Sequence, residues 1–159
     1  KNRVSYFGYG ANRNPAMMEA IVGRKPRGYQ AEVSGFELCV QNWVEMKGRV
    51  REVLQTSWNS HFKSYVLRPS TKLGARVKGV IWEINQLERK LIDNWELTGI
   101  WYSVFLLTIK GHQNKQIEIQ VVDDPGIKRV VDGLKYKTFL NSREKMLDVA
   151  RRCRQEYLK

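Results

Sequence analysis

The sequence contains few of the residues that build disulfide frameworks and metal centres. Its 159 residues include two cysteines, Cys39 and Cys153, and two histidines, His61 and His112. The cysteines lie far apart and each falls in an apolar pattern, so we expect both to pack as small hydrophobic side chains without a disulfide. The histidines stand alone in polar segments. This scarcity argues against a structural metal site, and we expect no metal.

Long apolar runs are also missing. No stretch approaches the roughly 20 residues needed to cross a bilayer, and no signal-peptide pattern is present. We therefore expect no membrane span and a cytoplasmic location. The length suits a single domain over residues 1–159, long enough to bury roughly two-thirds of the surface of the unfolded chain. A hydrophobic content of 42%, with 5 Trp, 7 Tyr and 5 Phe, suits a packed globular core.

Basic residues outnumber acidic ones and give a formal net charge of +12. Such an excess is found in proteins that bind nucleic acid or acidic membranes, and it can equally attract a small anionic substrate. The basic residues are spread along the chain, without a long basic block, zinc-finger spacing or an aromatic RNA-binding motif. A solvated basic surface is the simplest interpretation, and nucleic-acid binding stays open as a less favoured alternative.

The hydrophobic pattern predicts many strands and a few helices. Asn14 and Pro15 suit the start of a helix, Asn85 and Glu88 form a capping-box pattern, and Asn141 with Glu144 forms another. The predicted helices cover residues 15–22, 86–95 and 141–157, and the predicted strands cover 4–9, 28–34, 36–41, 50–57, 64–67, 77–84, 101–109 and 116–122. This pattern predicts an α+β fold, in which a small, curved, antiparallel or mixed barrel-like sheet is flanked by helices.

The N-terminal segment is the most distinctive part of the chain. Tyr6-Phe7-Gly8-Tyr9-Gly10-Ala11-Asn12 runs from an apolar strand through a glycine-containing turn to a helix start. Backbone N–H groups gather at such a corner and can hold a carboxylate or a developing oxyanion. A glycine there lets a ligand approach the main chain, where a Cβ would block it. The alternative interpretation is an ordinary tight turn between a strand and a helix.

Among the acidic residues, Glu96 has the most unusual surroundings. It follows a predicted helix and lies close in sequence to Trp95, Trp101 and Tyr102. Apolar surroundings disfavour the charged form of a carboxyl group and therefore suit it to general acid–base chemistry. The alternative is a glutamate at a helix end that bonds to a loop. Asp93 is the nearby competitor, although its neighbours are less aromatic.

Three blocks of the sequence together resemble the γ-glutamylcyclotransferase-like family. The N-terminal segment 6–12 is similar to that family's Tyr-Phe-x-Tyr-Gly-Ser-Asn loop, and Val77-Lys78-Gly79-Val80-Ile81-Trp82 is similar to its Val-x-Gly-Val-x-Trp/Tyr strand. Leu91-Ile92-Asp93-Asn94-Trp95-Glu96, with Tyr102 six residues later, resembles its Leu-Asp-x-x-Glu segment and following Tyr. The order and separation of the blocks agree with the family over positions 4 to about 109, and the rest of the chain matches loosely.

The resemblance implies a small β-barrel flanked by helices and a reaction that releases 5-oxoproline from a small-molecule γ-glutamyl compound. It implies that Glu96 is the catalytic acid and base, without a cofactor. It also implies that the substrate is bound by Tyr6, Phe7, Gly8, Tyr9, Gly10, Ala11, Asn12 and Tyr102.

Two departures from the family pattern bear on that implication. Ala11 stands where the family usually has Ser, so a hydroxyl contact is missing. The segment 50–75, with its Trp58-Asn59-Ser60-His61 loop, is longer and more polar than the resemblance suggests and can reshape or cover a pocket. The leaving amine stays open among an amino acid, a peptide, a polyamine, a protein lysine and a protected biosynthetic intermediate. A non-catalytic basic module that binds nucleic acid or protein on the same fold is the alternative function, and the sequence gives no oligomeric state.

Overall fold

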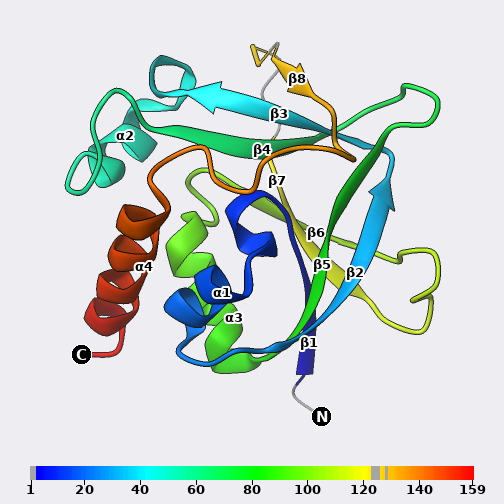
Figure 1. The fold of residues 1–159 in the computed structure, drawn as a ribbon, viewed down its shortest axis with the longest axis horizontal. Helices are drawn as coiled ribbons and strands as arrows, with labels where there is room; N and C mark the ends of the chain where they lie inside the picture. The colour runs from blue at the N-terminus through cyan, green and yellow to red at the C-terminus, as the bar shows by residue number, and fades with distance from the viewer. Residues whose placement is uncertain (1–2, 123–125, 128) are drawn as a thin grey trace.

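The structure is a computed structural model that describes residues 3–122, 126–127 and 129–159. It confirms the predicted α+β fold (Figure 1). The strands are β1 (Arg3–Gly8), β2 (Arg27–Ser34), β3 (Phe36–Asn42), β4 (Lys63–Pro69), β5 (Arg76–Asn85), β6 (Ser103–Leu107), β7 (Ile117–Val121) and β8 (Val130–Val131). The helices are α1 (Pro15–Val22), α2 (Gly48–Leu54), α3 (Gln86–Glu96) and α4 (Arg143–Tyr157), with short 3₁₀ helices η1 (Gly10–Arg13) and η2 (Trp43–Glu45).

The strands form two sheets that enclose one hydrophobic core. The five-stranded sheet has the order β2-β5-β1-β7-β6, in which β1 is antiparallel to β5 and parallel to β7. The three-stranded sheet has the order β4-β3-β8. The amide of Val122, just after β7, donates to the carbonyl of Leu67 in β4 at 2.9 Å and so links the two sheets. Fully buried side chains of both sheets, such as Phe7 and Leu38, meet in the space between them.

Strand β1 serves two different cores because its side chains alternate in direction. Phe7 points into the core between the sheets. Its neighbour Tyr6 points the other way, into a second buried cluster that includes Met17 of α1, Ile92 of α3 and Leu147 of α4. Figure 1 shows these three helices side by side on one side of the sheets. The N-terminal strand therefore lies between the sheet core and the helical layer.

The predicted helix starts are confirmed where a capping side chain lies next to its helix. The Asn14 side chain accepts a hydrogen bond from the Met17 amide at 3.1 Å, and α1 ends at Gly23, which has a φ of 92°. Asn85 and Glu88 form the predicted reciprocal capping box of α3. These caps depend on residues a few positions apart, which is why the sequence pattern was sufficient to find them.

Two other predictions are wrong. The segment predicted as a strand over 50–57 forms α2, followed by a turn, because Val50 and Leu54 are one helical turn apart and pack into the same cluster beside Met46 and Phe62. The cap of α4 is Ser142, whose hydroxyl accepts from the Lys145 amide at 3.3 Å, rather than Asn141.

The side chain of Asn141 instead bridges to the main chain of Lys63, which it contacts through both its oxygen and its nitrogen at 3.1 and 2.7 Å. The strand predicted over 101–109 is also shorter, since β6 covers Ser103–Leu107. In the parts of the chain that the structure describes, no helix is long and apolar enough to span a membrane.

Candidate active site

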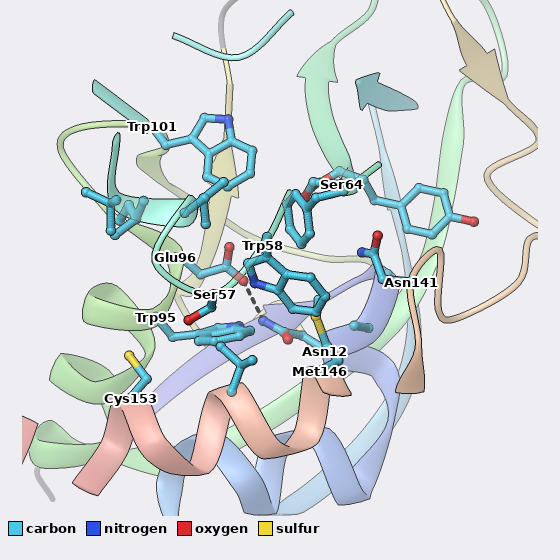
Figure 2. A pocket seen from close by; sticks show the side chains of 18 of the residues that line it. Asn12, Ser57, Trp58, Ser64, Trp95, Glu96, Trp101, Asn141, Met146 and Cys153 are labelled. Carbon is cyan, nitrogen blue, oxygen red and sulfur yellow. Dashed lines mark hydrogen bonds between the residues drawn. The ribbon is translucent and has the colours of Figure 1, made fainter. Parts of the chain in front are cut away.

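A cavity of about 470 Å³ lies where the helical layer meets the loops of the two sheets (Figure 2). Its walls come from η1, the end of α3, the segment from α2 to β4, and α4. These elements are far apart in the sequence, so the cavity depends on the complete tertiary packing. The predicted residues that line it are Tyr6, Tyr9, Gly10, Ala11, Asn12, Glu96 and Tyr102.

Glu96 is the last residue of α3 and its half-buried side chain faces this cavity. The helix ends there because Leu97 adopts a left-handed conformation, with a φ of 54° and a ψ of 45°. Leu97 is the only non-glycine residue with a positive φ among the described residues. A side chain in this conformation costs roughly 1–2 kcal/mol. The turn at Leu97 therefore ends the helix with the carboxyl group at the cavity wall.

Asn12, in the N-terminal segment, holds the carboxyl group of Glu96 by a hydrogen bond. Its Nδ2 donates to Glu96 Oε1 and to the hydroxyl oxygen of Tyr6, both at 2.7 Å, and Figure 2 shows the contact with Glu96. The main chain of Asn12 is fixed as well, because the indole N–H of Trp82 in β5 donates to its carbonyl oxygen at 2.7 Å. The Asn12 side chain is thus held by the fold in the orientation that reaches Glu96.

Burial raises the pKa of Glu96 from 4.5 to about 7. The hydrogen bond from Asn12 opposes this shift, because it favours the charged form, and the negative charge of Asp93 adds to it. Asp93 itself accepts from Thr98 and Gln120 at 3.3 and 3.2 Å. At neutral pH, Glu96 is therefore populated in both protonation states and can take up or release a proton.

The turn at the start of η1 contributes Gly10, Ala11 and Asn12 to the cavity lining. The Gly10 amide donates to the Tyr136 hydroxyl at 3.2 Å, and the Asn12 amide donates to the Tyr9 carbonyl at 3.2 Å. Ala11 lies in the first turn of η1, where backbone amides lack a carbonyl partner within the helix. Such an amide can donate to a ligand.

Gly8 has a role other than ligand approach, whereas Gly10 lines the cavity. A Cβ at Gly8 would clash with the Asn12 carbonyl and lie 2.9 Å from the Trp82 indole nitrogen, so the absence of a side chain lets η1 fold back onto β5. Gly10 has a φ of 61°, and the ring of Tyr65 packs beside it. Gly8 does not line the cavity, and Phe7 is fully buried between the sheets.

Two tyrosines at the cavity donate their hydroxyl protons to main-chain carbonyl groups. The Tyr102 hydroxyl donates to the Tyr65 carbonyl at 2.9 Å, and the Tyr9 hydroxyl donates to the Gln120 carbonyl at 2.6 Å. Burial raises the pKa of both Tyr9 and Tyr102 well above the usual value, so both remain uncharged. Their hydroxyl oxygens can accept hydrogen bonds.

Sequence reasoning missed most of the opposite wall of the cavity. The sequence had suggested that the loop at Trp58 can cover a pocket, but it gave no sign of Phe62, of Ser64 in β4, of Asn141 before α4 or of Met146 in α4 as lining residues. The helical spacing of Val50 and Leu54 was the available signal for the segment after α2. Met146 and Cys153 of α4 lie at the cavity.

In the described ranges, no group of three or more His, Cys, Asp or Glu side chains is arranged to hold a metal ion. Cys39 is buried and Cys153 is partly buried, and both are free thiols. Cys153 accepts a hydrogen bond from the Asn94 side chain at 3.2 Å. Around Glu96, the polar groups of the cavity lining include the Asn12 amide side chain and the hydroxyl groups of Tyr6, Tyr9 and Tyr102.

Comparison with known protein families and with curated proteins finds no match to this sequence. Comparison with solved structures does. An uncharacterized protein from Homo sapiens matches with a TM-score of 0.58 at 17% identity, over 82% of this chain and 71% of that one. An Arabidopsis thaliana protein matches with a TM-score of 0.54 at 15% identity, over 99% of this chain and 87% of that one.

A γ-glutamyl cyclotransferase matches with a TM-score of 0.58 at 15% identity, over 80% of this chain and 70% of that one. Identities this low carry information about the backbone arrangement and not about the reaction. In its fold, this chain is similar to a γ-glutamyl cyclotransferase.

Proposed function

We propose that this protein is a γ-glutamylcyclotransferase, which converts a γ-glutamyl compound into 5-oxoproline and a free amine, with Glu96 as the general acid and base. The observation that carries the proposal is the carboxyl group of Glu96, which lies at the wall of a cavity, accepts a hydrogen bond from Asn12 and has a pKa raised to about 7. The fold, which is similar to that of a γ-glutamyl cyclotransferase, is compatible with this reaction.

The reaction needs a proton carrier and a folded substrate more than it needs a nucleophile from the protein. Glu96 takes a proton from the substrate's α-ammonium group, and the freed amine attacks the γ-carbonyl carbon to form the ring N–C bond. Glu96 then gives a proton to the leaving nitrogen as its C–N bond breaks. Overall, two protons pass from the α-nitrogen to the leaving nitrogen, one of them through solvent, and Glu96 returns to its initial state.

Two physical effects account for the rate in this scheme. Orienting the α-amine against the carbonyl within one molecule supplies about 7–11 kcal/mol. Proton transfer through a group whose pKa lies near the working pH contributes about 10²–10⁴-fold. Asn12 serves both effects, because it holds the Glu96 carboxyl group and forms part of the cavity wall.

The turn at Ala11 is the proposed binding site for negative charge on the substrate. The Ala11 amide lies at the start of a 3₁₀ helix, where amides have no partner within the helix. Donation from this amide to the carbonyl oxygen of the reacting group would stabilise the charge that develops there. In this scheme the backbone makes the contact, so the absence of a hydroxyl at Ala11 does not prevent the reaction.

The test is to incubate the wild-type protein and Glu96→Gln with a panel of γ-glutamyl amino acids, peptides and amines, and to follow 5-oxoproline by mass spectrometry. We expect product from the wild type and a loss of about 10²-fold or more in the variant. Asp93→Asn is the matched control, since it removes a neighbouring carboxylate and keeps an oxygen that accepts from Thr98 and Gln120. The Asp93→Asn variant should still form 5-oxoproline.

A folded wild-type protein that forms no 5-oxoproline from any member of the panel would refute the proposal. An undiminished rate in Glu96→Gln would refute the role of that residue.

A further inference from the structure

The cavity lining combines two kinds of side chain. The polar groups of Tyr6, Asn12 and Glu96 are linked by hydrogen bonds. The aromatic side chains of Trp58, Phe62, Trp95 and Trp101 form what we call the aromatic wall. Figure 2 shows the three tryptophans around Glu96. A ligand whose reacting carbonyl lies beside Glu96 must therefore direct its remaining atoms along aromatic side chains.

Contacts within the protein hold much of the aromatic wall in place before any ligand binds. The rings of Trp58 and Phe62 pack at 4.7 Å between centroids. The indole N–H of Trp101 donates to Gln41 Oε1 at 2.9 Å. Phe62 and Trp101 are 5% and 8% exposed. A preformed aromatic surface binds an apolar group without first ordering its own side chains.

The cavity is larger than a γ-glutamyl group requires. At about 470 Å³, it falls within the range of roughly 300–1,000 Å³ that holds drug-sized ligands. The glutamyl group is a short chain, and its reaction requires its γ-carbonyl to lie beside Glu96. The remaining volume, along the aromatic wall, is left for the group carried by the leaving amine.

The charges around the aromatic wall disfavour a cationic group there. Lys145 Nζ lies 4.7 Å from the ring centroid of Trp58, so the protein's own ammonium group already uses the attraction of that ring for cations. Lys63 lines the same cavity. Among the described lining residues, the acidic side chains are Glu96 and Glu156, and Glu156 pairs with Lys159 at 2.9 Å. A polyamine or lysine chain would meet like charges without a free carboxylate beyond Glu96.

We propose that the leaving amine of the substrate carries an uncharged aromatic group, which binds along the aromatic wall, and that Trp58 is a specificity-determining residue. This inference rests on the proposed function and extends it from the reaction to the class of substrate. It argues against a polyamine or a protein lysine as the leaving amine, both of which the sequence had allowed.

Binding can be measured without turnover in the Glu96→Gln variant. Isothermal titration would compare γ-glutamyl-phenethylamide, γ-glutamyl-alanine and γ-glutamyl-putrescine. We expect the phenethylamide to bind at least about tenfold more tightly than either of the others, since burial of an aromatic group against aromatic side chains exceeds the 1.4 kcal/mol that a tenfold difference requires. Equal affinities, or tighter binding of the putrescine compound, would overturn the inference.

Turnover in variants of the wall gives the second test. We expect Trp58→Ala to lower kcat/KM for the phenethylamide about tenfold while changing that for γ-glutamyl-alanine less than about threefold. Trp58→Phe, which keeps an aromatic ring, should retain most of the wild-type kcat/KM for the phenethylamide. Equal losses on both substrates would overturn the role of Trp58.

A charge reversal tests the same idea without changing the wall itself. Lys145 is exposed on α4, and Lys145→Glu should raise the relative kcat/KM for γ-glutamyl-putrescine. An unchanged ratio between the putrescine and phenethylamide substrates would contradict the charge argument. The two proposals fail differently: an absence of 5-oxoproline from every substrate refutes the cyclotransferase, whereas product without aromatic preference refutes only the substrate class.

Discussion

The raised pKa of Glu96 should make the protein less stable as the pH rises toward neutrality. Its pKa is 4.5 in its ordinary state and about 7 in the folded protein. Between these values the folded protein holds a proton that the unfolded chain has already released, so the free energy of unfolding falls with increasing pH. Since each unit is worth about 1.4 kcal/mol, this single group lowers the stability by about 3 kcal/mol at and above pH ~7.5.

Replacing Glu96 with glutamine should remove this pH dependence. The glutamine carbonyl oxygen can still accept the hydrogen bond from Asn12, and no charge has to be buried. We expect Glu96→Gln to be more stable than the wild type by up to about 3 kcal/mol above pH ~7, and to approach it near pH ~4.5. Residues that serve function often lower the free energy of unfolding of the protein that contains them.

The assay is urea unfolding followed by tryptophan fluorescence at a series of pH values from about 4.5 to 8. Other titrating groups are common to both proteins and largely cancel in the difference. Glu19→Gln, at an exposed position on α1, is the matched control and should change the stability by less than about 0.5 kcal/mol throughout. Parallel pH curves for the wild type and Glu96→Gln would refute the argument that burial governs this carboxyl group.

Two further predictions concern the surroundings of Glu96. Asp93→Asn removes a negative charge that raises the pKa of Glu96. The rise of kcat/KM with pH, which reports the ionisation of this base, should therefore move from about pH 7 to lower pH. A pH–rate profile that does not move would contradict this prediction. Gly8→Ala forces a methyl group against the carbonyl of Asn12 and should destabilise the protein by about 1–3 kcal/mol in urea unfolding. The same change at Gly48, whose nearest atom would be 3.9 Å away at the start of α2, should be neutral or slightly stabilising; equal losses at both glycines would refute the argument from close approach.

The parts of the fold that the sequence predicted correctly are those decided within one helix or strand. The caps at Asn14 and Asn85 bond to amides three residues away, so their chemistry is visible in the sequence. The apolar neighbours of Glu96 also lie within a few positions of it, which made its raised proton affinity predictable. Its role in catalysis remains a prediction.

The parts that were missed depend on contacts between distant segments. Asn12 and Glu96 are 84 positions apart, and only the resemblance to a known family placed them near one site. Residues 50–57 contain β-branched valines that favour a strand in isolation. They form a helix because Val50 is fully buried against residues from other elements. Asn141 likewise binds a strand 78 positions away instead of capping its own helix.

The raised pKa of Glu96 depends on the position of α4. This helix supplies one wall of the cavity, and it is fastened to the neighbouring layer by contacts such as that from Arg154 Nε to the Ala20 carbonyl at 3.1 Å. If α4 separated by a transient local opening, water would reach the carboxyl group and its pKa would return toward 4.5. The raised pKa of Glu96 is therefore a property of the closed conformation alone.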